Sequence, residues 1–311
     1  MKEVDVKFSI AIPAFKKRYL FDAIKSCLNQ TYSNLEIVVV DDCSPEDLSS
    51  VVKSINDVRV KYFRNKTNIG AINVVDNWNR CLSLCSGEYV ICMGDDDMLM
   101  PNCIDEYIKL INKYPSLDVF HARTATINEN GEFIGIVQSR NEFENIYEFM
   151  RHRFDGWMQY VGDFCYRTSA LKSVNGFYKQ PLAWGSDDIT AFIAIGKKGI
   201  ANTNTVSFLY RTNSWSITSS SYTSAKLLSN VQTFKWVERF LSDCTLQTLE
   251  EELTYAVLVE KLPIVKQNMQ ASLLLQCFKR NKITIFKYYL QRKEFEITTK
   301  TILKSIIRSL K

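Results

Sequence analysis

The sequence lacks any run of about 18–20 uninterrupted apolar residues, which is the length that a membrane-spanning helix requires. It also lacks the pattern of a secretory leader, because acids stand in its first residues, MKEVDVKFSIAIP, where a signal peptide is apolar. We therefore expect a protein that neither crosses a membrane nor is exported by this route.

No CxxC pair occurs among the nine cysteines, and their number is odd. This pattern disfavours a disulfide framework and a structural zinc site, and it favours a reducing cytoplasm. Histidine is scarce too. The two present, His121 and His152, stand outside any recognisable motif, so we expect both to be structural.

A length of 311 residues, with 46% hydrophobic and 23% charged residues, is ordinary for a soluble globular protein. It predicts one large domain plus an appendage. The net charge of +5 is unevenly spread, because residues 279–311 hold ten basic side chains and two acidic ones. Such a tail could meet an anionic lipid surface, or it could be a solvated helical face. Nucleic-acid binding is not expected, since the tail lacks the aromatic interleaving of a single-strand platform.

Apolar runs and helical patterns alternate through the first 115 residues. Strands are predicted at 8–12, 35–40, 58–63 and 89–93, and helices at 20–28, 46–55, 70–84 and 103–113. This alternation predicts an α/β fold, in which a mostly parallel mixed sheet is flanked by helices.

After Pro115 the rhythm changes. The segments 118–128 and 133–138 flank an Asn-Gly turn and predict a hairpin. Residues 224–310 are helical in character, with one turn expected near Leu262-Pro263. The predicted organisation is a first domain at 1–220, with halves 1–115 and 116–220, followed by a helical C-terminal region at 221–311.

Three adjacent carboxylates, Asp95 to Asp97, follow the predicted strand at 89–93. Such charges repel one another, so a fold tolerates them where a cation, hydrogen-bond donors or water offset the charge. At the carboxyl end of a strand in an open α/β sheet, where ligands usually bind, the expected cation is a divalent metal carrying phosphates. The alternative is a solvated acidic turn ahead of a helix that starts at Pro101.

An ordered set of motifs extends over residues 7–215. They are SIAIPAF at 9–15, CLNQTY at 27–32, VVVDDCS at 38–44, NIG at 68–70, GEY at 87–89, DDD at 95–97 and Pro101. In this order they resemble the family-2 glycosyltransferases, enzymes of the nucleotide-diphospho-sugar transferase type A fold. The combination is far more specific than any single piece.

The resemblance implies a nucleotide-sugar donor, with UDP as the expected nucleotide. The residues that would bind the nucleotide follow the strand ends: Pro13, Ala14, Phe15, Asp41, Asn68, Gly70, Asp95 and Arg211. Backbone amides and the Phe15 ring would frame the base, and Asp41 would accept from a pyrimidine ring N–H. Alternatively, Asp41 and Asp42 would cap a helix that begins near Pro45, with Ser44 as its N-cap.

The acids at 95–97 resemble the family's DxDD metal motif, with Gly94 in place of the first Asp. Asp96, with Asp97 beside it, is the expected ligand of Mg²⁺ or Mn²⁺. The ion would take the rest of its shell from diphosphate oxygens and water, and it would neutralise the leaving nucleoside diphosphate.

A second acidic pair, Asp187 and Asp188, resembles the family's ED motif, with Ser186 in place of the Glu. An inverting transfer needs a carboxylate on the face of the sugar opposite the diphosphate, to take a proton from the attacking hydroxyl. Asp187 is the expected base and Asp188 its competitor. The alternative is helix N-capping, with Ser186 as the cap and both acids in the first turn.

Two further segments depart from the family pattern. Trp78 stands near the place of an Arg, which leaves Arg80 or another donor to contact the diphosphate. The segment YRTNSWS at 210–216 resembles YRxHxxS but has no His, so the contact there would fall to Arg211 or Asn213. Among the aromatic residues, Trp184 and Trp157 are candidate platforms for a sugar ring, although large aromatics are more often core.

Together these inferences predict an inverting, metal-dependent glycosyltransferase that acts on a hydroxyl of a surface glycan or lipid-linked saccharide. A sugar nucleotidyltransferase is an alternative, disfavoured because no Gly-rich signature with Lys and Arg follows the first strand. A non-catalytic sugar- or lipid-surface-binding module is another. The family's usual context implies work at the cytoplasmic face of the membrane, where the C-terminal helices would dock on anionic lipid or on a second subunit of a homodimer.

Overall fold

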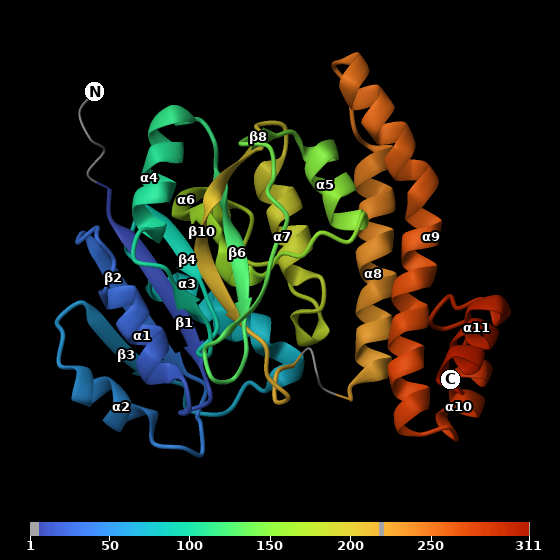
Figure 1. Cartoon of the computed structure of the whole chain (residues 1–311), viewed down its shortest axis with the longest axis horizontal. Coiled ribbons are helices and arrows are strands. Elements are labelled where there is room, and N and C mark those ends of the chain that lie inside the picture. Colours follow the sequence, from blue (N-terminus) through green and yellow to red (C-terminus); the bar gives the residue numbers. More distant parts are fainter. Residues whose placement is uncertain (1–5, 218–220, 311) are drawn as a thin grey trace.

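The computed structural model describes residues 6–217 and 221–310, which form a mixed sheet with helices on both faces (Figure 1). The strands are β1 (Phe8–Ala14), β2 (Leu35–Asp41), β3 (Val60–Arg64), β4 (Tyr89–Cys92), β5 (Met98–Leu99), β6 (Val119–Ile127), β7 (Phe133–Ile136), β8 (Phe143–Glu144), β9 (Phe164–Arg167) and β10 (Ile200–Arg211). Their order in the sheet is β3-β2-β1-β4-β9-β6-β10-β5, with β7 beside β6 and β8 beside β10. The predicted fold class is confirmed.

The helices follow the strands along most of the chain. They are α1 (Leu20–Leu28), α2 (Leu48–Ile55), α3 (Val74–Leu84), α4 (Cys103–Lys113), α5 (Ile146–Phe154), α6 (Thr168–Ser173), α7 (Ser186–Ile195), α8 (Thr223–Ser242), α9 (Leu249–Arg280), α10 (Thr284–Leu290) and α11 (Thr299–Ser309). Short 3₁₀ turns lie at η1 (Ala71–Asn73), η2 (Val161–Asp163) and η3 (Pro181–Ala183). No helix in these described ranges is both long and apolar enough to pass through a bilayer.

The strands β3, β2, β1 and β4 run parallel, and Ala11 of β1 lies opposite Val38 and Cys92. Ile10 and Ile37 pack with α1 and α4 in one core cluster, whereas Ala11 and Val38 pack with α3 in a second cluster. Both faces of these strands are therefore buried, which explains why their sequences are almost continuously apolar. Their carboxyl ends meet at one edge of the sheet, and that edge is where ligands bind in open α/β sheets.

The second half of the sheet is mostly antiparallel. β9 runs antiparallel to both β4 and β6, and the predicted hairpin forms as β6 and β7. The long strand β10 is absent from the sequence-based prediction. Its polar stretch 202–205 hides the apolar pattern, and the pairing of β10 with β6 shifts register there. Irregular pairing of this kind removes the strict alternation by which a strand is recognised.

The helical region packs against the sheet domain over part of its length. Phe234 of α8 and Leu258 of α9 belong to the same core cluster as α3 and α7, and Figure 1 shows α10 and α11 on the outer side of α9. The turn predicted near Leu262-Pro263 is wrong, because α9 continues through Pro263. Leu262 is buried there, so tertiary packing outweighs the hydrogen bond that proline removes. The chain turns instead at residues 243–248, and Thr248 caps α9.

A buried carboxylate on β2 gives a prediction about stability. Glu36 is 2% exposed and accepts hydrogen bonds from Lys61 Nζ at 2.6 Å, Ser9 Oγ at 2.7 Å and the Ser86 N–H at 2.7 Å. Burial alone would raise its pKa, but these donors outweigh it and hold the pKa of Glu36 below its ordinary value. Glu36→Gln should lower the free energy of unfolding at pH 7 by about 2 kcal/mol, because buried donors lose an acceptor. Urea unfolding monitored by circular dichroism measures the loss.

The pH dependence and a surface control test the cause. Because the folded-state pKa is lowered, the contribution of Glu36 is present above the unfolded pKa, about 4.3, and is lost as the pH falls below it. The difference between wild type and Glu36→Gln should therefore shrink in acid. Glu142→Gln removes a pair with the exposed Lys113 and should cost less than about 1 kcal/mol. Equal losses in the two variants would contradict the role of burial.

Candidate active site

The loop after β4 lies beside the loop after β1. Asp95 Oδ2 accepts from the N–H groups of Phe15 and Lys16, each at 2.7 Å. Burial and the neighbouring Asp96 raise the pKa of Asp95 to about 6, although the two N–H groups lower it. The Phe15 amide, expected to frame a base, is thus taken by Asp95. The Phe15 ring is 41% exposed at the sheet edge. Pro13 and Ala14 are the last residues of β1.

Asp41 is enclosed within the fold at the end of β2. Its Oδ1 accepts from the Ser44 N–H at 2.7 Å, and its Oδ2 accepts from the Tyr62 hydroxyl at 2.5 Å and pairs with Arg64. Asp41 has no exposed surface, so the structure does not present its carboxylate to a nucleotide base. The expected contact with a pyrimidine does not fit this arrangement. Helix capping is not its role either, because Asp47 caps α2.

Asp42 joins the end of β2 to the turn at 68–70. Its Oδ1 accepts from the Ile69 N–H at 2.9 Å and its Oδ2 from the Gly70 N–H at 3.1 Å. Asn68 donates from Nδ2 to the Asp42 carbonyl at 2.8 Å, and Gly70 has a φ of 80°, which favours glycine. Asn68 and Gly70 therefore lie at the carboxyl edge of the sheet, as predicted, and Asp42 is the residue that places them there.

The other two acids of the run converge on Gly94. Asp97 Oδ1 accepts from the Arg211 N–H at 2.9 Å, and Asp96 Oδ2 accepts from Asn213 Nδ2 at 2.6 Å. A Cβ added at Gly94 would lie 2.7 Å from Asp96 Oδ1 and 3.0 Å from Asp97 Oδ2, so the remaining oxygen of each carboxylate faces the same small space. Burial and Asp96 raise the pKa of Asp97 well above its ordinary value. The run is therefore not a solvated turn, and α4 begins only at Cys103.

Two converging carboxylate oxygens suit a divalent cation that keeps most of its shell for other oxygen ligands. Within the described ranges, no group of three His, Cys, Asp or Glu side chains is placed to hold a metal ion by itself. A metal at Asp96 and Asp97 would thus depend on oxygens from a bound ligand or water. This donor set fits the Mg²⁺ or Mn²⁺ that the sequence predicts.

The side chain of Arg211 contacts the backbone of the loop that carries the three acids. The side chain is buried, and its Nε donates to the Asp96 carbonyl at 2.8 Å while Nη1 donates to the carbonyls of Asn128 and Glu129. The guanidinium also lies 4.3 Å from the ring centroid of Tyr19. The expected contact between Arg211 and a diphosphate therefore does not fit, and Arg211 instead fixes the backbone of the loop that carries Asp96.

A cavity of about 510 Å³ brings the two acidic segments together. Its volume is in the usual range for small-molecule sites. It is lined by polar and aromatic residues that include Asp97, Arg153, Gln159, Tyr160, Trp184, Asp187, Asp188, Tyr210 and Asn213. Helices α8 and α9 complete the wall through Asn230, Phe234, Val265 and Met269. The C-terminal region is thus part of the candidate site.

The two acids of the second pair have different surroundings, although both lie in the first turn of α7. Asp188 is buried, and its Oδ1 accepts from Arg153 Nε at 2.7 Å and from Gln159 Nε2 at 2.8 Å. Asp187 is partly exposed in the cavity. Burial and Asp188 raise the pKa of Asp187 to about 7, against the opposing charge of Arg153. A carboxylate poised near neutral pH suits a general base.

Two tryptophans predicted as sugar platforms have separate places. Trp184 lines the cavity, with Lys226 Nζ 4.9 Å from its ring centroid. Trp157 is not among the residues that line it: its ring stacks on His152 at a centroid distance of 4.0 Å, and the guanidinium of Arg140 lies 5.4 Å from it. Trp157 therefore lies outside the cavity, and its predicted platform role does not fit this place, whereas Trp184 lies in the cavity wall.

The model of glycosyl transferase family 2 matches residues 9–174, which is more than half of the chain. The chain belongs to glycosyl transferase family 2. A GalNAc(5)-diNAcBac-PP-undecaprenol beta-1,3-glucosyltransferase of Campylobacter jejuni is 37% identical over 110 residues, which cover 34% of this chain and 35% of that one. The chain thus spans about a third of the length of the curated relatives it matches first.

Solved glycosyltransferase structures share the fold of this family 2 chain. S. aureus TarS 1-349 in complex with UDP-GlcNAc has a TM-score of 0.63 at 16% identity, covering 97% of this chain and 89% of that one. The mannosyltransferase PcManGT from Pyrobaculum calidifontis, in complex with GDP-Man and Mn²⁺, has a TM-score of 0.57 at 14% identity, covering 99% and 88%. At these identities the likeness concerns the fold alone.

The departures from the family 2 pattern have structural explanations. An Asp at position 94 would displace the carboxylates of Asp96 and Asp97, so Gly94 suits their convergence. Ser186 is fully buried and its Oγ accepts from the Gln180 N–H at 3.2 Å, which leaves no room for a Glu and shows that it is not the helix cap. Asn213, in the segment that lacks the family's His, still contacts Asp96.

Some residues of the site carry no signal in the sequence. Arg153 and Gln159 hold Asp188, yet Arg153 ends an ordinary helical segment and Gln159 lies in a loop. Arg80, which the sequence offers as a donor for the diphosphate, is exposed and does not line the cavity. Trp78 lines it instead. Among the described residues that line the cavity, the cationic one is Arg153, which only the tertiary structure identifies.

Proposed function

We propose that this chain is an inverting, metal-dependent glycosyltransferase that moves a sugar from a nucleotide sugar to an acceptor hydroxyl. One observation carries the proposal: a single cavity is lined both by Asp97 of the acidic run and by Asp187, a partly exposed carboxylate with a raised pKa. A donor whose diphosphate lies at Asp97 would have its anomeric carbon in the cavity that Asp187 also lines. This is the arrangement that a direct displacement requires.

The reaction follows from the roles of these residues. Asp187 accepts the proton of the acceptor hydroxyl, whose oxygen attacks the anomeric carbon. The new glycosidic C–O bond forms as the bond between the anomeric carbon and the diphosphate oxygen breaks, and the nucleoside diphosphate leaves with the electron pair. Arg153 and Gln159 hold Asp188 beside the base, and Trp184 offers an aromatic face to a sugar ring.

Asp96 and Asp97 would hold Mg²⁺ or Mn²⁺, and Asn213 orients Asp96 through its amide. When bound, the cation supplies neutralisation of the charge on the leaving diphosphate. The nucleotide would lie along the strand ends that carry Phe15, Asn68 and Gly70. Asp42 and Asp95 hold these segments in place through backbone hydrogen bonds.

Relatives support the choice of donor and acceptor. The TarS structure holds UDP-GlcNAc and the PcManGT structure holds GDP-Man with Mn²⁺, and UDP fits the sequence-based expectation for this chain. The Campylobacter relative is named for a polyprenol-diphosphate-linked saccharide, which supports a lipid-linked or surface glycan as acceptor. This function places the enzyme at the cytoplasmic face of a membrane.

A donor panel tests the proposed function. We expect one UDP-sugar to raise the melting temperature in the presence of Mn²⁺, because a ligand bound only by the native state stabilises it. The enzyme should hydrolyse the same UDP-sugar slowly when water is the acceptor, and it should release UDP faster when a saccharide acceptor is present. Consumption of a sugar phosphate and a nucleoside triphosphate would point to a nucleotidyltransferase instead. Tight binding of a UDP-sugar without release of UDP would point to a non-catalytic module.

A further inference from the structure

Helix α11 carries two exposed ridges side by side. Leu303, Ile307 and Leu310 are 54%, 59% and 67% exposed, and their spacing of four and three residues places them on one face of the helix. Lys300, Lys304 and Arg308 recur every four residues and form a basic ridge next to the apolar one. The opposite face, with Ile302 and Ser305, is buried against α9.

Helix α10 repeats the same combination. Ile283, Phe286 and Leu290 are 83%, 69% and 61% exposed and lie on one side of the helix, while Tyr288 is buried on the other. Exposed lysines stand beside this ridge at 282 and 287. A monomeric soluble protein rarely exposes several large apolar side chains together, so such a surface marks an interaction site.

Charge distinguishes this surface from an exposed apolar ridge on α9. Leu249, Leu253 and Ile264 of α9 are also more than half exposed, but four glutamates lie among them, at 250–252 and at 260. In the tail, residues 279–311, by contrast, ten residues are basic and two are acidic. One of these acids, Glu296, is already paired with Lys235 and Lys266. The partner of α10 and α11 must therefore offer both an apolar interior and negative charge.

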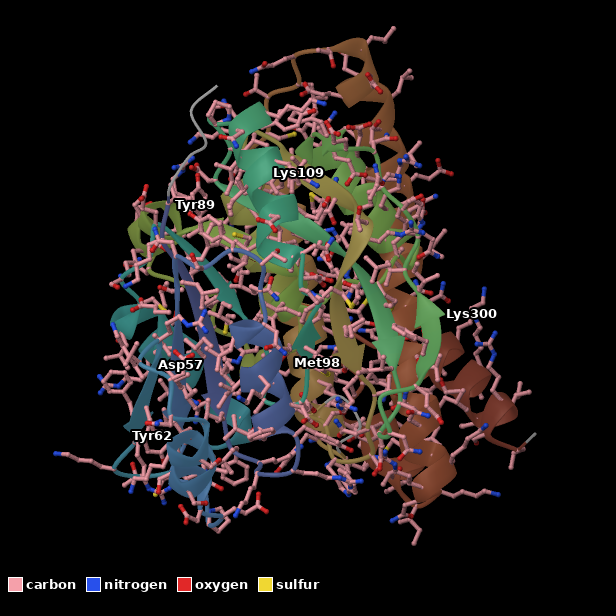
Figure 2. The ribbon with its side chains drawn as sticks, turned by 60° about the vertical axis from the view of Figure 1, so that its left-hand side comes forward. Asp57, Tyr62, Tyr89, Met98, Lys109 and Lys300 are labelled. Carbon is pink, nitrogen blue, oxygen red and sulfur yellow. The ribbon has the colours of Figure 1, made fainter. Side chains whose placement is uncertain are left out.

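The position of these helices relates them to the cavity. Val265 and Met269 of α9 line the cavity, while the next two residues of α9 hold the tail: Gln270 Nε2 donates to the Phe295 carbonyl at 2.9 Å, and Ser305 Oγ of α11 donates to the Ala271 carbonyl at 3.2 Å. Figure 2 shows Lys300 at the opposite edge of the molecule from Asp57, which precedes β3, and from Tyr62 of β3. The tail is thus one helix away from the acidic cavity and far from the β3 edge.

We propose that α10 and α11 form an interfacial anchor that docks on an anionic lipid surface. The apolar ridges enter the boundary between headgroups and acyl chains, and the basic ridge meets anionic headgroups, as in amphipathic helices that lie in the membrane plane. An acceptor held in that surface by a lipid would then approach the cavity along α9. This last step rests on the proposed function, whereas the contact with lipid does not.

Vesicle flotation of the full chain tests the anchor. We expect the protein to float with phosphatidylcholine vesicles that contain phosphatidylglycerol, to stay at the bottom with phosphatidylcholine alone, and to release partly in high salt. Neutralising Lys300, Lys304 and Arg308 by alanine should weaken binding about fivefold for each charge. The double variant Leu303→Ser/Ile307→Ser should weaken it by at least about tenfold, since both side chains leave the lipid.

A matched control uses the acidic ridge. Leu249→Ser/Leu253→Ser removes from α9 two leucines that are more exposed than Leu303 and Ile307, and it should leave flotation unchanged, with melting temperatures confirming that all variants fold. Flotation that survives the α11 double variant, or that fails with wild type, overturns the proposal. Light scattering would also overturn it if the wild type were a dimer and the α11 double variant a monomer, because the apolar ridge of α11 would then pack against a second copy of the chain. Release of UDP from a soluble donor is measured in a separate assay. If the protein floats with anionic vesicles but transfers no sugar, only the proposed function is rejected, not the anchor.

Discussion

Replacing Asp187 by Asn should lower kcat by about 10²–10⁴-fold while leaving the KM for the donor nearly unchanged. Asn has the size of Asp but cannot accept the proton of the acceptor hydroxyl. Both acids of the pair line the cavity, but the carboxylate of Asp188 accepts from Arg153 and Gln159, whereas Asp187 is partly exposed there. Initial rates of UDP release with a saccharide acceptor, measured at saturating donor, give the ratio.

The pH profile separates a base from a residue that only supports the fold. Burial and Asp188 raise the pKa of Asp187 to about 7, so its basic form is populated above that pH, and the rate of the wild-type enzyme should rise through pH 7 and level off above it. Asp188→Asn keeps an oxygen for Arg153 and Gln159 but removes a negative charge. The rising limb should then move to lower pH, with most of the plateau rate retained. If Asp188→Asn lost the plateau rate while Asp187→Asn stayed active, Asp188 would be the general base and Asp187 the supporting residue.

The first half of the fold could be predicted from the sequence because its signals are local. Strands buried on both faces give continuous apolar runs, as in Leu35–Asp41, and each run ends in polar residues at the sheet edge. The strand β10 and the uninterrupted helix α9 could not be predicted in the same way. In β10 the polar residues 202–205 interrupt the pattern, and at Pro263 of α9 the burial of Leu262 overrides a local helix breaker.

In the site, the sequence indicates which residue types gather but not which atoms face the cavity. Asp41 and Asp42 are adjacent acids, yet the first is enclosed by Tyr62 and Arg64 and the second fixes the turn at 68–70. Their side chains leave opposite sides of the backbone, and which side is open depends on neighbours from β3. Arg211 illustrates the same limit, because its partners are carbonyls about a hundred residues away in the chain.

Asp95 can serve as a control for Asp96, its neighbour in the acidic run, because the structure gives the two carboxylates different tasks. Asp95 Oδ2 holds the amides of Phe15 and Lys16, whereas Asp96 Oδ1 faces the space above Gly94. Asp95→Asn keeps an acceptor oxygen, so it should preserve the affinity for Mn²⁺ and act mainly on the KM for the donor and on the melting temperature.

Asp96→Asn should abolish Mn²⁺ binding in the presence of UDP and lower kcat/KM by about 10³-fold, because the charge of the leaving diphosphate would lose several kcal/mol of stabilisation. The free Mn²⁺ signal in electron paramagnetic resonance, titrated with protein and UDP, reads the binding without reference to turnover. Removing the metal from wild type with EDTA should reproduce the kinetic loss, and Mn²⁺ should restore it. If Asp96→Asn bound Mn²⁺ as wild type does while Asp95→Asn did not, the ion would lie on the side of the acidic run that faces the β1 loop, and Gly94 would have no part in the metal site.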